Sequence, residues 1–224
     1  HESGVVSGVQ SAKGADDDAL MLDESTSAAG GIDFEPKQTD VYYFSPQKNL
    51  ASDGGLWIAL VSPKAIGRIE AVASSGRYIP NILSLQLALD NSRQNFTLNT
   101  PSLATIFFAN NQVQWINDNG GLAWADSRTR ESSDLLYHWA EKTKVTKPFV
   151  ENPKHRSQVV ATINFDDSID ALGIAQILRD NGIVDTEPYR KLGKNQLRVA
   201  TFVSTEPSEV ERLIASIEYV LERI

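Results

Sequence analysis

The segment from Val41 to Val61, VYYFSPQKNLASDGGLWIALV, contains the most informative pattern in this chain. Two short runs rich in β-branched and aromatic residues, 41–44 and 56–61, flank a turn that carries one lysine, Lys48. Such runs, bounded by Pro or Gly, predict two buried strands. Partial loss of hydration in a turn between buried strands disfavours the charged form of an amine and makes it a better nucleophile. Lys48 therefore fits a lysine that bonds covalently to a carbonyl compound, although a solvated loop lysine fits the same spacing.

Three further motifs accompany this segment. They are Asn99-Thr100-Pro101, the run GIVDTEPYRKLG at 182–193, and NQLRVA at 195–200. Together with the lysine segment they resemble the phosphoserine aminotransferases, and most of all their actinobacterial branch, over nearly the whole chain. The resemblance implies the α/β fold of the aspartate-aminotransferase class, with pyridoxal 5′-phosphate (PLP) as the cofactor.

The composition excludes several other classes of protein. The chain has 224 residues, of which 41% are apolar and 22% charged, so it has ample capacity for a core. A net charge of −8 without a basic block argues against a nucleic-acid partner. No stretch approaches the ~18 apolar residues of a membrane span. With no cysteine and three scattered histidines we expect no metal site, and a cytoplasmic enzyme fits these properties.

The position of the lysine indicates which part of a subunit the chain represents. In the family a long N-terminal part precedes the lysine, whereas 47 residues precede Lys48 here. We therefore expect the C-terminal portion of a PLP-dependent transferase fold. Residues 1–147 should form part of the large PLP-binding domain and a bridging helix, and 148–224 the small C-terminal α/β domain, with a linker at 147–153.

Apolar periodicity and turn residues predict the local structure. In the first part we expect strands at 19–22, 41–44 and 56–61, a helix from Pro63, irregular or partner-facing structure at 74–100, and helices from Pro101 and over 122–142. In the second part we expect strands at 158–165 and 196–203 and helices at 168–181 and 207–224. Ser168 is the expected N-cap and Gly182 the expected C-cap of the first of these helices. The last helix has one apolar stripe, which predicts a core-facing side.

PLP chemistry needs an amine for the aldehyde and a carboxylate for the pyridine nitrogen. Lys48 supplies the amine and, once freed, is placed to move a proton as general base and acid. The carboxylate comes from Asp23 or Glu24 at the end of the first strand. Counting back from Lys48 without gaps favours Glu24, whereas counting forward from Gly4 favours Asp23. We predict Asp23, because its shorter side chain suits a close ion pair. A strand-end carboxylate that caps the next turn fits the pattern as well.

The cofactor phosphate needs neutral hydrogen-bond donors. The resemblance assigns this role to Gln47, Asn99 and Thr100, the last two reaching the cofactor of the neighbouring subunit in a homodimer. Considered alone, the motif at 99–101 is also typical of a helix-capping turn.

Hydroxyl groups offer weaker candidates for the same phosphate. Ser25 and Thr26 follow the strand that carries Asp23. Family members also use a threonine near the start of this region, and Ser3 is its nearest equivalent here.

Arg198 lies in an otherwise apolar run, where an unpaired cation is costly. Its planar fork matches a carboxylate, which belongs either to the substrate or to an internal Asp or Glu. By resemblance it holds the substrate α-carboxylate. Arg190 and Lys191, on the preceding loop, are candidates for the substrate phosphate.

The resulting hypothesis is an aminotransferase of serine biosynthesis that acts on small amino and keto acids. It interconverts 3-phosphohydroxypyruvate and glutamate with O-phosphoserine and 2-oxoglutarate. One alternative is an aminotransferase of the same fold for alanine or serine. Another is an inactive, truncated fragment that dimerises. Fold by itself does not decide among them.

Overall fold

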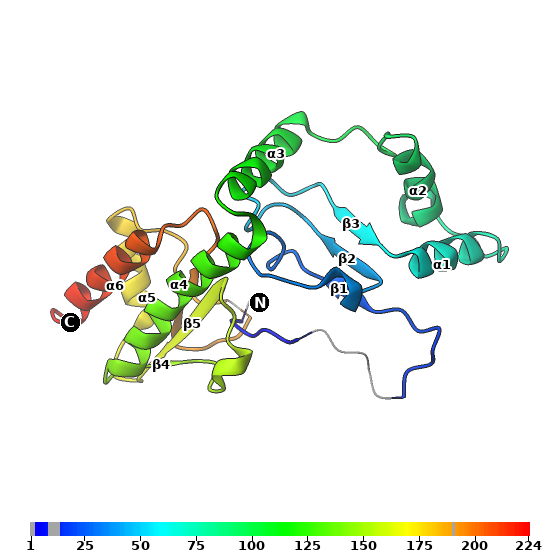
Figure 1. Ribbon diagram of the computed structural model, residues 1–224. Helices are drawn as coiled ribbons and strands as arrows, with labels where there is room; N and C mark the ends of the chain where they lie inside the picture. The colour runs from blue at the N-terminus through cyan, green and yellow to red at the C-terminus, as the bar shows by residue number, and fades with distance from the viewer. Residues whose placement is uncertain (1–2, 9–13, 190) are drawn as a thin grey trace. The chain divides into compact units, whose positions relative to one another are not determined.

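The computed structural model describes residues 3–8, 14–189 and 191–224 (Figure 1). The chain forms two compact units. The lysine unit contains residues 14–26 and 34–112, and the C-terminal unit contains residues 3–8, 27–33 and 113–224 apart from residue 190. Each unit is built around its own three-stranded sheet. Within the described residues, no helix is long and apolar enough to cross a membrane.

The sheet of the lysine unit has the order β1-β2-β3. Its strands are β1 (Leu22–Glu24), β2 (Val41–Phe44) and β3 (Ile58–Val61), with β1 parallel and β3 antiparallel to β2. The prediction of β2 is confirmed, and β3 begins two residues later than expected. The strand predicted at 19–22 is wrong in position, because Lys64 Nζ binds the carbonyl oxygens of Asp17 (2.9 Å) and Ala19 (2.7 Å) and draws that segment toward helix α1.

Helix α1 (Pro63–Ala73) begins at Pro63 as predicted, and the Ser62 hydroxyl caps it by accepting the N–H of Ala65 at 3.1 Å. The segment expected to be irregular contains α2 (Leu85–Arg93), which lies beside α1 (Figure 1). This helix was missed because its apolar residues all lie in its first half, so the helical periodicity is short and weak. Polar contacts also hold it, among them the Ser84 cap and the ion pair of Arg93 with Glu70 at 3.0 Å.

Helix α3 (Leu103–Asp118) begins two residues after Pro101, which therefore precedes the helix and does not occupy its first turn. The reason is Ser102, whose hydroxyl accepts the N–H of Thr105 at 3.4 Å and marks the helix start. Three short 3₁₀ turns complete the described elements: η1 (Pro36–Gln38), η2 (Asn81–Leu83) and η3 (Pro153–His155).

The C-terminal unit has an antiparallel sheet of order β4-β5-β6, with β4 (Thr146–Pro148), β5 (Val160–Phe165) and β6 (Gln196–Ala200). Strand β4 overlaps the start of the stretch predicted as a linker, 147–153. It was missed because it is short and ends in proline, which an edge strand tolerates. Helix α4 (Gly121–Lys142) has the predicted extent and belongs wholly to this unit. The expected domain boundary at 147/148 concerns a complete subunit and stays a prediction.

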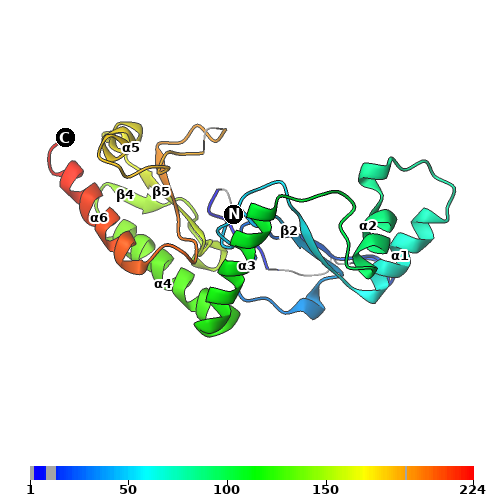
Figure 2. The ribbon, with the colours of Figure 1, turned by 90° about the horizontal axis from the view of Figure 1, so that it is seen from above.

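Helices α4, α5 (Ala171–Asp180) and α6 (Pro207–Leu221) pack their buried side chains against one face of this sheet, with α4 and α6 side by side (Figure 2). The sheet contributes Ala161, Ile163, Phe165, Leu197 and Val199 to the shared core. The stripe predicted on the last helix lies in this core over most of its length, including the buried residues Val210, Ile217 and Val220. Ile224 follows the end of the helix and is 63% exposed.

At the ends of α5, the predicted N-cap is wrong, and the predicted glycine lies one residue after the C-cap, Asn181. Asp170, and not Ser168, occupies the N-cap position. At the other end Gly182 has φ +85°, and the N–H of Ile183 binds the carbonyl of Leu178 at 2.9 Å. These are the marks of a helix that ends on a left-handed glycine, as predicted.

The side chain of Asn195 explains where α5 begins. Its Oδ1 accepts the first helical N–H, that of Ala171, at 3.1 Å. Its Nδ2 donates to three carbonyl oxygens just before the helix, those of Ile169 (2.7 Å), Asp166 (3.1 Å) and Phe165 (3.3 Å). One amide thus joins the end of β5, the start of α5 and the start of β6.

Replacing Asn195 should therefore cost more than replacing an ordinary surface asparagine. We expect Asn195→Ala to lower the free energy of unfolding by about 1–3 kcal/mol, because several partly buried backbone groups lose their partner. The matched control is Asn181→Ala, since Asn181 donates one exposed bond to Ile177 (2.9 Å) and should stay within about 0.5 kcal/mol of wild type. Urea unfolding measures both, and equal midpoints for the two variants would contradict the assignment.

Candidate active site

Lys48 lies half-buried on a turn that hydrogen bonds hold in place. At its start, the N–H of Ser45 binds Thr26 Oγ1 (3.2 Å) and the Ser45 hydroxyl donates to the carbonyl of Leu56 (2.6 Å). The N–H of Ala51 then binds the Lys48 carbonyl at 2.9 Å. The lysine is therefore presented from a defined turn that leads from β2 toward β3.

The residues that follow Lys48 attach the turn to helix α3. Asn49 is completely buried, and its carbonyl accepts a bond from Gln112 Nε2 at 3.1 Å. Farther along, the Ser52 hydroxyl donates to the carbonyl of Thr105 at 2.6 Å. Both bonds attach the turn to α3, a segment more than fifty residues away in sequence. This support was not visible in the sequence.

The structure separates the two candidate carboxylates. The Glu24 side chain is exposed and accepts bonds from the N–H and the hydroxyl of Thr26, so it caps its own turn. Asp23 is half-buried and pairs in register with Tyr42, so its side chain lies on the opposite face of the strand. The alternative of a capping carboxylate thus describes Glu24, and Asp23 is the better candidate for a cofactor.

Ser25 is buried and its hydroxyl is hydrogen-bonded to Tyr42. Burial raises the pKa of Tyr42 to about 12; the bond to Ser25 opposes the rise, and the carboxylates of Asp23 and Glu24 contribute to it. Tyr42 therefore stays neutral at physiological pH. Its ring stacks on that of Phe34, with centroids 3.9 Å apart, which makes this face of the sheet aromatic.

The topology brings Asp23 and Lys48 to the same edge of the sheet. Strands β1 and β2 are parallel, so their carboxyl ends lie together, and the bond from Ser45 to Thr26 joins the segments that follow them. Ligands of α/β proteins bind at this edge. An amine, a carboxylate and hydroxyl groups are also the donor set that PLP requires, so the described residues fit this cofactor.

The remaining phosphate candidates are exposed or lie elsewhere. Gln47 is exposed, as are Asn99 and Thr100 on the loop between α2 and α3. The alternative role of Asn99 and Thr100 as a helix cap is wrong, because Ser102 caps α3. Ser3 belongs to the C-terminal unit, where its carbonyl accepts a bond from the hydroxyl of Thr162 at 2.9 Å.

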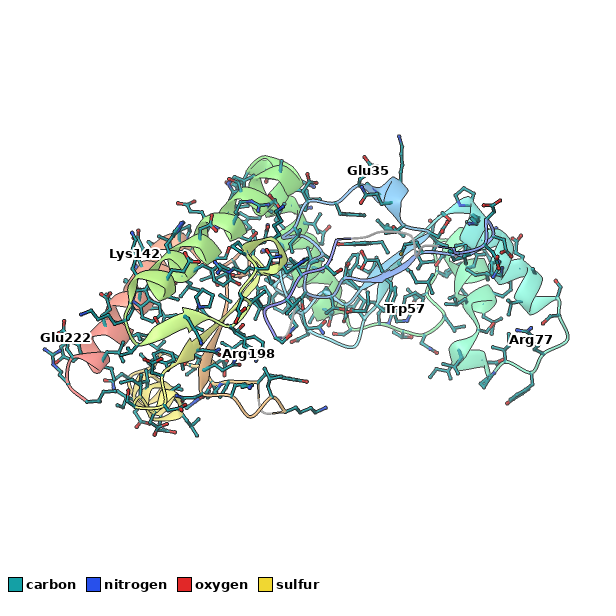
Figure 3. The ribbon with its side chains drawn as sticks, turned by 90° about the horizontal axis from the view of Figure 1, so that it is seen from below. Glu35, Trp57, Arg77, Lys142, Arg198 and Glu222 are labelled. Carbon is teal, nitrogen blue, oxygen red and sulfur yellow. The ribbon has the colours of Figure 1, made fainter. Side chains whose placement is uncertain are left out.

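Arg198 projects from β6 on the face opposite the core, because its neighbours Leu197 and Val199 are core residues (Figure 3). It is half-buried, and its guanidinium lies 5.7 Å from the centre of the Tyr189 ring. None of the ion pairs among the described residues involves Arg198. The alternative of an internal ion pair therefore finds no support in the described part of the chain.

The two other cationic candidates, Arg190 and Lys191, are consecutive in the sequence. Arg190 lies outside the described residues. Lys191 is exposed on the loop before β6. Sequence reasoning missed Tyr189, although it precedes Arg190 in the same motif, because an aromatic residue in a loop gives no signal of the cation that it contacts.

Comparison with known proteins places the chain in a family. The sequence pattern of the family described as Aminotransferase class-V matches residues 2–186. The chain belongs to this family. The phosphoserine aminotransferase of Rhodococcus jostii is 54% identical over 93% of this chain and 56% of its own length. This class-V aminotransferase chain thus spans about half the length of the curated relatives it matches.

Solved structures agree with the fold. A phosphoserine aminotransferase from Cytophaga hutchinsonii superposes with a TM-score of 0.85 at 22% identity, over 97% of this chain and 60% of that one. An alanine–glyoxylate aminotransferase from Nostoc superposes with a TM-score of 0.76 at 20% identity, over 90% of this chain and 54% of that one. The predicted α/β fold, present as part of a PLP-dependent aminotransferase, is confirmed.

Proposed function

We propose that this class-V aminotransferase chain serves the phosphoserine reaction. This reaction interconverts 3-phosphohydroxypyruvate and L-glutamate with O-phospho-L-serine and 2-oxoglutarate. The observation that carries the proposal is the common sheet edge that presents Lys48 and Asp23, together with a half-buried Arg198 that has no carboxylate partner in the described chain. The name and 54% identity of the Rhodococcus jostii relative support the substrate. A cytoplasmic location in serine biosynthesis accords with this role.

In this proposal PLP supplies the aldehyde that accepts the amino group and the ring that withdraws electrons from the reacting carbon. Lys48 would hold the cofactor through its Nζ, and its amine would be placed to move a proton at the substrate Cα. The Asp23 carboxylate would keep the pyridine nitrogen of the cofactor protonated. Gln47 and Ser25 are the proposed donors to the cofactor from the same subunit.

The substrate side is assigned to the C-terminal unit. The planar fork of Arg198 suits the α-carboxylate that both amino donors share. Arg190 and Lys191 are the proposed contacts of the substrate phosphate.

We also propose a homodimer in which Asn99 and Thr100 reach the cofactor phosphate of the other subunit. Both lie exposed on a loop, and the apolar residues around them are exposed as well: Phe96, Leu98, Leu103 and Phe107. Apolar side chains gathered around a polar loop are typical of a protein interface.

An aminotransferase of alanine or serine is the second candidate, because the Nostoc alanine–glyoxylate enzyme shares the fold. The two candidates differ in the need for a phosphate contact. An inactive dimerising fragment is the third candidate, and it predicts no cofactor binding.

Loss of the Lys48 amine should remove covalent cofactor binding. We expect Lys48→Ala to lack the visible absorbance of lysine-bound PLP and to lose transamination, whereas the exposed Lys37→Ala should keep both. Borohydride reduction followed by peptide mass spectrometry identifies the labelled lysine. A label on another lysine would refute the site, and no label in wild type would favour the inactive fragment.

Arg198→Lys keeps the charge but loses the planar fork. Losing one of two charge-assisted bonds should cost about 1.5–3 kcal/mol, which is about a ten- to hundredfold loss in kcat/KM for glutamate and phosphoserine alike. Lys191→Met should lower kcat/KM for phosphoserine more than kcat/KM for glutamate. Steady-state kinetics with both donors and with alanine tests this contrast, and a preference for alanine over phosphoserine in wild type would favour the second candidate.

Mixing two inactive variants tests the shared sites. Lys48→Ala and Asn99→Asp subunits are each expected to be inactive, the second because its carboxylate repels the phosphate. A mixed dimer has one site in which Lys48 and Asn99 are both intact. In an equal mixture about half of the dimers are mixed, so activity should return to about one quarter of the wild-type value. Activity that does not return on mixing, or a monomer that is fully active, would refute the proposal.

A further inference from the structure

The segment that joins α5 to β6 carries Tyr189, the aromatic neighbour of Arg198. We call residues 183–189 of this segment the strap. It leaves α5 at Gly182 and passes beside β6, where the N–H of Arg198 donates to the carbonyl of Thr186 at 3.0 Å. The strap therefore touches Arg198 through its backbone at Thr186 and through its ring at Tyr189.

Arg179, in the last turn of α5, holds the strap on both sides of Thr186. Its Nη2 binds Asp185 Oδ1 at 3.0 Å and its Nε binds Glu187 Oε1 at 2.5 Å. Asp185 has φ +64°, a conformation that few residues other than glycine adopt without support. One guanidinium thus keeps three consecutive strap residues in place.

Both kinds of charge in this cluster are stable near neutral pH. The hydrogen bonds to Glu187 and Asp185 raise the pKa of Arg179, and the bond to Arg179 lowers the pKa of Glu187. Arg179 is 40% exposed, so the ion pairs add little to global stability. Their consequence is local: together with the backbone bond from Arg198 to Thr186, they hold the strap that carries Tyr189.

The contact with Tyr189 matters because Arg198 has no ion pair among the described residues. Arg156 offers a comparison, since its guanidinium also lies over a ring, that of Tyr137 (5.2 Å), but is in addition paired with Glu141 at 2.7 Å. For Arg198, the Tyr189 ring is the side-chain contact that restricts the orientation of the guanidinium. Without it, a long side chain must lose its rotamer freedom when a carboxylate binds.

We propose that Arg179 is a positioning residue for the carboxylate-binding Arg198, acting through the strap and the Tyr189 ring. The part of this inference that concerns substrate rests on the proposed function. The part that concerns the Arg198 side chain does not, and it is tested separately.

The first experiment measures how fast phenylglyoxal modifies Arg198, by peptide mass spectrometry on the whole chain. In Arg179→Met and Tyr189→Leu the rate should rise about two- to fivefold, the range that corresponds to losing an exposed cation–π contact. Tyr189→Phe keeps the ring and should match wild type. The control Arg212→Met removes an exposed arginine of the same unit, whose partner Glu209 is 3.8 Å away, and should also match wild type.

The second experiment measures KM and kcat for both amino donors. Arg179→Met should raise KM for glutamate and phosphoserine equally, by about three- to tenfold, with kcat nearly unchanged. The midpoint of thermal unfolding should shift no more than in Arg212→Met.

The outcomes separate the two proposals. An unchanged modification rate at Arg198 in Arg179→Met overturns the positioning role, whatever the enzyme does. A raised rate with unchanged KM in an active enzyme overturns its importance for substrate. If the rate is raised in Arg179→Met and the wild type is itself inactive toward both donors, the positioning of Arg198 is supported and the proposed function is overturned.

Discussion

The parallel pairing of β1 with β2 is the constraint on which the cofactor half of the site depends. It requires both strands to end at one edge of the sheet, and the residues that follow each strand are then brought together. Asp23 lies in β1 and Lys48, twenty-five residues later, follows β2, so the parallel pairing brings both to this edge of the sheet. The bond between Ser45 and Thr26 holds the two segments in register, and β3 closes the turn from its other end. A shift of one residue in this pairing would turn Asp23 to the other face.

A second constraint comes from the cost of leaving a partly buried cation without a partner. Most arginines of the C-terminal unit satisfy it with a carboxylate, as Arg179 does with Asp185 and Glu187. Arg198 is half-buried and has an aromatic ring instead. A guanidinium in this state gains more from an external carboxylate than a paired one does, because no internal bond has to be broken first. Arg198 costs free energy in the folded sheet because it is partly desolvated without a carboxylate. For the same reason it is well suited to bind a substrate carboxylate.

The fold of this chain occurs in enzymes that act on different substrates. The family match and the fold show what kind of protein this is, yet the same fold is found in a phosphoserine and an alanine–glyoxylate aminotransferase. In our proposal, the choice between such substrates depends on a few side chains of β6 and of the loop before it. These side chains are polar and lie outside the core, so they can change without loss of the fold.

The sequence by itself determined the elements whose signals are local. The apolar run of β2, the proline that opens α1, the extent of α4 and the stripe of α6 all depend on neighbours within one element. It also named Lys48 and Arg198. Helix α2 and strand β4 could not be predicted in this way, because the apolar residues of α2 all lie in its first half and β4 exists through its pairing with β5. The preference for Asp23 over Glu24 came from the sequence, through the shorter side chain, and it stays a prediction. The Asn195 cap and the contacts of Tyr189 with Arg198 were decided by the tertiary structure alone, since each depends on which distant groups meet in space.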